Sequence, residues 1–150
     1  MDALRWGTAH LSDEEFLREF ESCRLPGESF HHADHVRVSW IYLRRFDEAT
    51  AQERMAQSVQ RFATHHGSPR KFHVTMTLAW MRLVAAAWRA TPAIARFEEF
   101  AAAHPRLLDP QALAQHYSAE LLGSASARSA WVAPDLAPLP RACAVNGCAV

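Results

Sequence analysis

The chain has few cysteines, no net charge and no long apolar run, and each of these features excludes a class of protein. Three cysteines in 150 residues do not fit a disulfide framework, and the N-terminus lacks the basic start and apolar region of a signal peptide. A cytoplasmic location is therefore expected. Lys plus Arg and Asp plus Glu both number 16, which argues against a nucleic-acid binder. No apolar run approaches the ~20 residues of a membrane-spanning helix.

The length of the chain and its pattern of residues predict a single all-α domain. A length of 150 residues suits one domain with its own core, and no segment shows the sustained alternation of a strand. Start and stop signals predict an irregular helical bundle of six or seven helices within residues 1–131. The expected helices cover residues 11–23, 32–46, 47–66, 70–90, 93–103, 111–122 and 124–131. Residues 132–150 are rich in proline and alanine, so an extended or mobile tail is expected there.

The helix boundaries depend on recognisable capping residues. Ser12 opens a capping box before the first helix, and Asp47 is a suitable N-cap for the third. Gly67 is placed to end the third helix, and Ser68-Pro69 to begin the fourth. Helices two, three and four are expected to form the centre of the bundle.

Histidine is the unusual component of this sequence. Nine are present, and several fall in FHHADHVRVSWIYLRRF, residues 30–46. On a helix, His32 and His35 lie ~60° apart and share a face. Asp34 lies ~200° from His32 and is predicted to face away from the pair. We interpret Asp34 as a first-turn acid that complements the helix dipole, with Arg37 as its surface partner.

An i, i+3 pair of imidazoles can bind one metal ion, and His73 on the fourth helix is the best candidate for a third ligand. Three neutral imidazoles suit one divalent transition metal, either Zn, Fe, Cu or Ni. A free fourth coordination position would make such a site catalytic rather than structural. Our first hypothesis is therefore a small metal-binding enzyme in which His32, His35 and His73 hold the ion and a small organic molecule is the substrate.

Two alternatives remain open. In a metal-free isomerase, cyclase or lyase, one or two of the same histidines, His35 and His73 foremost, act with Tyr42 or Tyr117 as general acid and base. In a non-enzymatic binding or partner protein, the histidines are structural. The expected partner is a small-molecule ligand rather than a nucleic acid or a membrane, and an oligomer is left open. A cavity at which two histidines and a tyrosine converge would favour the metal-free enzyme, whereas scattered histidines without a cavity would favour the partner protein.

Other histidines and cysteines are weaker candidates. His65 and His66 end the third helix, where an imidazole favours the helix dipole. Cys143 and Cys148 lie in CAVNGC within the tail. Four intervening residues are not a usual zinc spacing, and no second cysteine pair exists, so a tail without function is favoured.

Two motifs around these histidines resemble those of an uncharacterised group of small bacterial helical proteins. The group carries F-x-H-x-x-H-(L/V)-R and, further along, K-(Y/F)-H-x-T-x-T. Here the first motif is Phe30, His32, His35, Val36 and Arg37, and the second is Lys71, Phe72, His73, Thr75 and Thr77. Many members place Glu directly after the second-motif histidine, where this chain has Val74. The likeness covers residues 30–135. It implies no reaction, but it singles out His32, His35 and His73.

Overall fold

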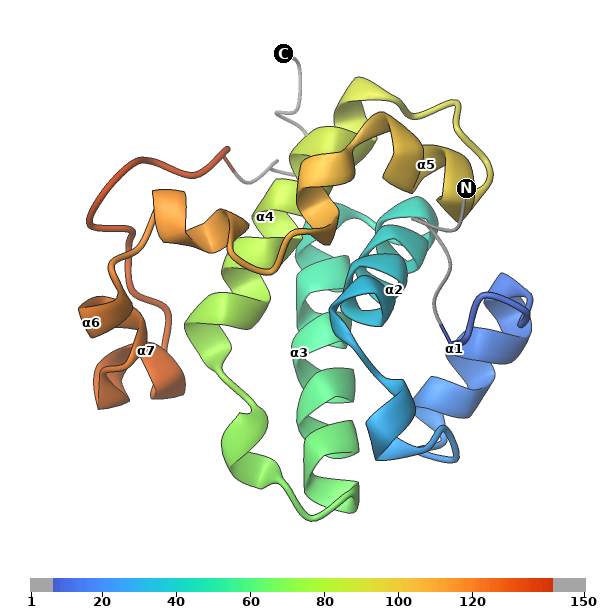
Figure 1. Ribbon diagram of the computed structural model, residues 1–150, viewed down its shortest axis with the longest axis horizontal. Helices are drawn as coiled ribbons and strands as arrows, with labels where there is room; N and C mark the ends of the chain where they lie inside the picture. The colour runs from blue at the N-terminus through green and yellow to red at the C-terminus, as the bar shows by residue number, and fades with distance from the viewer. Residues whose placement is uncertain (1–6, 142–150) are drawn as a thin grey trace.

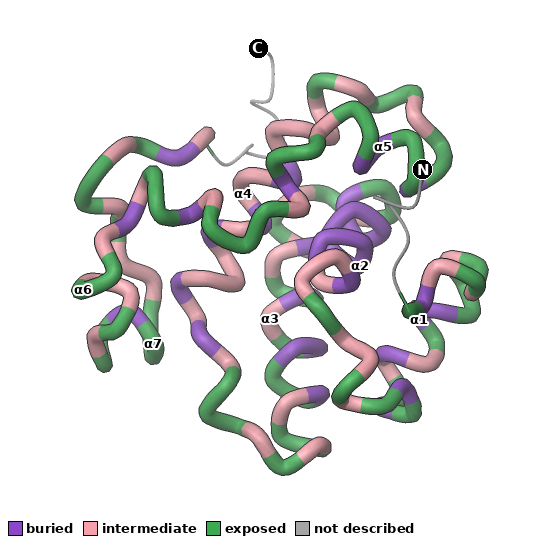
Figure 2. The backbone as a smooth tube through the Cα atoms, in the orientation of Figure 1, coloured by how far each residue is buried: buried purple, intermediate pink, exposed green. Residues whose placement is uncertain are grey.

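Helix α2 (His32–Arg45) is the axis of the fold. In this computed structural model, which describes residues 7–141, α2 packs against α3 (Glu48–His65) and α4 (Val74–Ala90). Every residue of α2 from 36 to 43 is buried (Figure 2). A helix without a solvent-facing stripe belongs to the core of a protein, so α2 lies at the centre of the fold, while α7 packs on α4 and α6 on α7.

Shorter elements cover the three central helices (Figure 1). They are α1 (Asp13–Glu21), α5 (Phe97–Ala103), α6 (Ala119–Leu122) and α7 (Ala125–Ser129), with 3₁₀ turns at Gly27–Ser29, Pro69–Lys71, Pro105–Leu108 and Ala112–Gln115. Residues 7–141 thus contain seven α-helices and no strand, which confirms the all-α prediction. None of these helices combines the length and the apolar character that crossing a membrane requires.

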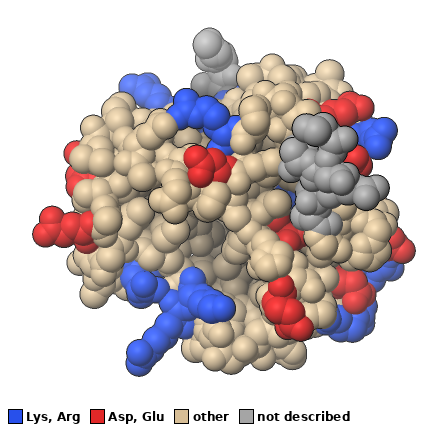
Figure 3. Space-filling view, in the orientation of Figure 1, with Lys and Arg blue, Asp and Glu red and all other residues tan. Residues whose placement is uncertain are grey.

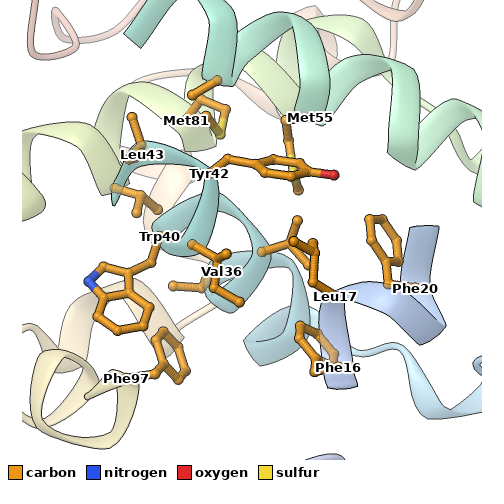
Figure 4. Close-up of a cluster of buried hydrophobic side chains, with 14 of the residues drawn as sticks. Phe16, Leu17, Phe20, Val36, Trp40, Tyr42, Leu43, Met55, Met81 and Phe97 are labelled. Atoms are coloured by element: carbon orange, nitrogen blue, oxygen red, sulfur yellow. The ribbon is translucent and has the colours of Figure 1, made fainter. Parts of the chain in front are cut away.

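A large apolar cluster holds α1, α2, α3, α4 and α5 together (Figure 4). Trp40 of α2 packs on Phe97 of α5, with ring centroids 5.6 Å apart. Phe16 of α1 and Met81 of α4 are fully buried in the same cluster. Burying one such side chain contributes about 1.5–3 kcal/mol, so this cluster supplies most of the apolar stabilisation of the fold.

Several predicted helix boundaries are confirmed by their caps. The Ser12 hydroxyl accepts a hydrogen bond from the Glu15 amide at 3.1 Å, and the capping box is complete. The Asp47 carboxylate accepts from the Thr50 amide at 2.8 Å and starts α3. Gly67 follows α3 with a φ of 75°, in the left-handed region that favours glycine.

Other predicted boundaries are wrong, because local signals were overridden. Ser68 makes no side-chain cap, and Pro69 starts only the 3₁₀ turn Pro69–Lys71. The fourth helix therefore begins at Val74 instead of residue 70. The fifth helix begins at Phe97 rather than near residue 93. The predicted helix over 111–122 is split into the 3₁₀ turn Ala112–Gln115 and α6.

The split before α6 has an identifiable cause at Ser118. Its hydroxyl accepts a hydrogen bond from the Leu121 amide at 3.1 Å, which makes Ser118 a new N-cap. The Ser118 amide and hydroxyl also donate to the carboxylate of Asp135, at 2.8 and 2.6 Å. A residue held in this way has the extended backbone of an N-cap, so a helix arriving from residue 111 cannot continue through it.

Residues 132–141 follow α7 without helical structure. The Val132 amide donates to the Thr75 hydroxyl of α4 at 3.1 Å, and Leu139 is buried in a small second cluster with Leu113 and Tyr117. This part of the predicted tail is thus packed on the helical body. Cys143 and Cys148 lie outside the described residues.

Candidate functional site

A cavity of about 170 Å³ lies between α2, α3 and α4. Its polar lining is His32, His35, Ser39, Lys71, His73 and Thr77. Its apolar lining is Val36, Met55, Val59, Met76, Trp80 and Val84. All three histidines selected from the sequence therefore meet at one cavity, although they contribute to it in different ways.

His35 is the histidine with unused hydrogen-bonding capacity. Its ring lies against Phe30, with centroids 4.4 Å apart, and it makes no hydrogen bond to another residue within 7–141. Burial, with a smaller contribution from the nearby His32, lowers the pKa of His35 from 6.5 to about 4. The ring is therefore neutral near pH 7, with one N–H and one lone pair for a guest in the cavity.

His32 is anchored by the chain that follows α5. Its Nε2–H donates to the carbonyl oxygen of Leu107 at 2.8 Å, and its ring meets Trp80 edge-on, with centroids 4.4 Å apart. Burial lowers the pKa of His32, while the Leu107 carbonyl and the charge of Asp109 act in the opposite direction. The Leu107 bond fixes a tautomer in which Nδ1 carries the lone pair of the neutral ring.

His73 has a structural role at the start of α4. Its Nδ1 accepts a hydrogen bond from the Met76 amide at 3.1 Å, which makes it the N-cap of the helix. Because Nδ1 is an acceptor, Nε2 bears the proton, and it donates to the carbonyl of Leu122 at 2.7 Å. Both ring nitrogens are thus occupied, and no lone pair remains for a metal ion or a substrate.

These bonds bear directly on the three-histidine metal site. Two of the three proposed ligands keep a free lone pair, and His73 does not. Within residues 7–141, no three His, Cys, Asp or Glu side chains are gathered so that they could hold a metal ion. The arrangement described here therefore does not fit a His32, His35, His73 centre, and binding of Zn, Fe, Cu or Ni stays a prediction.

The tyrosines considered as acid–base groups do not line this cavity. The Tyr42 hydroxyl donates to Glu21 at 2.6 Å and pairs with the Ser58 hydroxyl at 2.8 Å, and burial raises its pKa. The Tyr117 hydroxyl donates to the carbonyl of Val132 at 2.7 Å. Both phenols stabilise contacts between elements, so the structure does not bring them together with His35.

The expected surface pair in α2 is wrong. Asp34 is fully buried, and its carboxylate accepts hydrogen bonds from the His31 amide at 2.8 Å and from the Thr8 hydroxyl. Arg37 is also buried, and it bonds to Asp13 at 2.9 Å instead of to Asp34. These two residues fasten the segment before α1 to α2. The reason is tertiary, because that segment covers the face of α2 that helical geometry alone assigns to solvent.

Lys71 and Trp80 also line the cavity, although neither is among the site residues predicted from the sequence. Lys71 occupies the second motif, two residues before His73, and its place in that motif was the available signal. Trp80, which belongs to neither motif, forms part of the cavity wall and contacts His32.

No protein-family model, no curated protein and no solved structure matches this chain. The resemblance to an uncharacterised bacterial group therefore stays a prediction. The function has to be argued from the cavity itself.

Proposed function

We propose that the protein binds a small, mainly apolar organic molecule in the cavity between α2, α3 and α4, and that His35 orients it. The observation that carries the proposal is the His35 ring, which lines an otherwise largely apolar cavity without a hydrogen-bond partner among residues 7–141. Binding sites for small molecules are typically concave and apolar, with a few polar groups that set orientation.

The size of the cavity agrees with this role. Its volume is about 170 Å³, and an apolar cavity of roughly 150 Å³ is known to accept benzene. A single aromatic ring or a branched alkyl group therefore fits between Met55, Met76 and Trp80.

The chemistry of His35 favours binding over acid–base catalysis. General bases are most effective when their pKa lies near the working pH. The pKa of His35 is lowered to about 4 by burial, so the ring is a weak base near pH 7. It can still accept or donate one hydrogen bond, which is what orientation of a ligand requires.

Metal binding by His32 and His35 is the alternative function, since a ring nitrogen of each histidine retains a free lone pair. With only two protein ligands, the ion would need further donors from solvent or substrate. Elemental analysis of untagged protein, with His35→Ala as control, tests this alternative directly. If the parent protein contains one ion per chain and His35→Ala contains none, the metal site is correct and our proposal is wrong.

Ligand binding is tested by titrating a panel of small aromatic and branched alcohols, amides and acids, followed by ligand-observed NMR and by melting temperature. His35→Leu removes the polar anchor and keeps the volume of the side chain. The matched control is His65→Leu, because His65 is exposed and lines no part of the cavity. Loss of one ligand hydrogen bond in His35→Leu is expected to weaken binding about tenfold, with no change in the control. A panel without binders, or equal binding by both variants, refutes the proposal.

A further inference from the structure

A second cavity of about 380 Å³ adjoins the first on the side of α3. The two cavities share His35, Val59 and Lys71 as lining residues. His35 thus stands between them, with apolar side chains on one side and a mixed polar surface on the other. A molecule that contacts His35 from the first cavity can extend past it into the second.

The shared residue Lys71 supplies a positive charge to both cavities. It ends the 3₁₀ turn Pro69–Lys71, it is exposed, and it forms no ion pair with another residue of 7–141. Lys and Arg side chains gather on this face near the segment between α3 and α4 (Figure 3). Of the acidic residues in 7–141, only Glu28 joins Lys71 in lining the second cavity, and none lines the first.

The second cavity also contains an unsatisfied polar atom. Nε2 of His66 is buried and has no hydrogen-bond partner among the described residues. The ring is held against Phe62, with centroids 4.3 Å apart, and a side chain at Gly27 would come within 3.3 Å of it. A buried polar atom without a partner is costly, so a hydrogen-bonding group of a ligand that reaches Nε2 would remove this cost.

We infer that the ligand is a small aryl- or alkyl-carboxylic acid whose apolar body fills the first cavity and whose carboxylate lies where the two cavities meet, between His35 and Lys71. The inference rests on the proposed function and deepens it by naming the ligand class. Lys71 neutralises the carboxylate, the neutral His35 ring donates a hydrogen bond to it, and His66 lies beyond it on the side of the second cavity. Glu28 opposes the anion from the rim of the second cavity.

The test uses matched acids and amides, namely phenylacetate, 3-phenylpropionate and 4-phenylbutyrate with the corresponding amides. Each pair shares the apolar body and differs in charge. Dissociation constants are measured by calorimetry or NMR titration for the full chain and for Lys71→Met. The matched control is Arg70→Met, because Arg70 is an adjacent exposed cation that lines neither cavity.

We expect at least one acid to bind about three- to tenfold more tightly than its amide, the range for an ion pair that is partly exposed to water. Lys71→Met is expected to abolish this preference, Arg70→Met to preserve it, and Glu28→Gln to strengthen it. Added salt should weaken the preference as well.

Results that overturn the carboxylate inference can be distinguished from results that overturn the proposed function. Equal binding of acids and amides, or an acid preference that survives in Lys71→Met, overturns the carboxylate inference while small-molecule binding stands. If neither these compounds nor the neutral panel bind, both proposals are wrong.

Discussion

His73 provides the sharpest test of the structural interpretation, because its two hydrogen bonds can be removed together or separately. His73→Ala deletes the N-cap bond from the Met76 amide and leaves the carbonyl of Leu122 without its donor. Loss of an N-cap costs about 0.5–2 kcal/mol, and an unpaired, partly buried carbonyl costs about 1–3 kcal/mol. We therefore expect the free energy of unfolding to fall by about 1.5–5 kcal/mol, a large share of the ~5–15 kcal/mol that stabilises a typical domain.

The matched variant His73→Asn separates the two bonds. Asparagine is among the best N-cap residues, so it should restore the bond to the Met76 amide, but it is too short to replace the bond to Leu122. We expect it to recover about 1 kcal/mol relative to alanine. Urea unfolding of the three proteins gives the midpoint and the slope, and an unchanged slope shows that the comparison is valid.

Two results would refute this reasoning about His73. One is a stability of His73→Ala within about 0.5 kcal/mol of the parent, the range of an ordinary surface substitution. The other is a chelator that destabilises the parent protein but not His73→Ala. That outcome would mean that the side chain binds a metal ion and that its hydrogen bonds to Met76 and Leu122 are not its main role.

Three further predictions concern pH, a buried cation and a buried phenol. Because the pKa of His35 falls from 6.5 to about 4 on folding, the unfolded chain binds the proton more tightly. The free energy of unfolding should therefore drop by about 1–3 kcal/mol as the pH falls from 6.5 to 4. Its dependence on pH should be flatter in His35→Gln, and identical pH profiles of the parent and the variant would contradict this prediction. Arg37→Met should cost about 2–4 kcal/mol because it breaks the buried bonds to Asp13 and to two carbonyls; a melting temperature equal to that of the parent would show that those bonds contribute nothing. Tyr42→Phe should cost about 1–2 kcal/mol and leave ligand affinity unchanged, whereas weaker binding at unchanged stability would place Tyr42 in the site.

Much of the helical layout was predictable from the sequence, because helix caps are local. The bonds of Ser12 and Asp47 join residues three positions apart, so residue types alone indicate them. The same locality explains the failure at Ser68-Pro69, where both residues suit a helix start. The helix starts after His73 instead. The ring of His73 is fixed there by its hydrogen bond to the carbonyl of Leu122, 49 residues further along the chain.

The sequence by itself determined that the chain is all-α and that α2 carries a histidine pair on one face, because helical periodicity and residue type are enough for those conclusions. For His73 it offered only a candidate partner of that pair, since the packing of two helices is not written in either one. Only the tertiary structure decided what each histidine can do, because the available lone pairs depend on distant partners. The carbonyls of Leu107 and Leu122 fix the tautomers of His32 and His73. His35 receives no such partner among the described residues and is left neutral at the wall of a cavity.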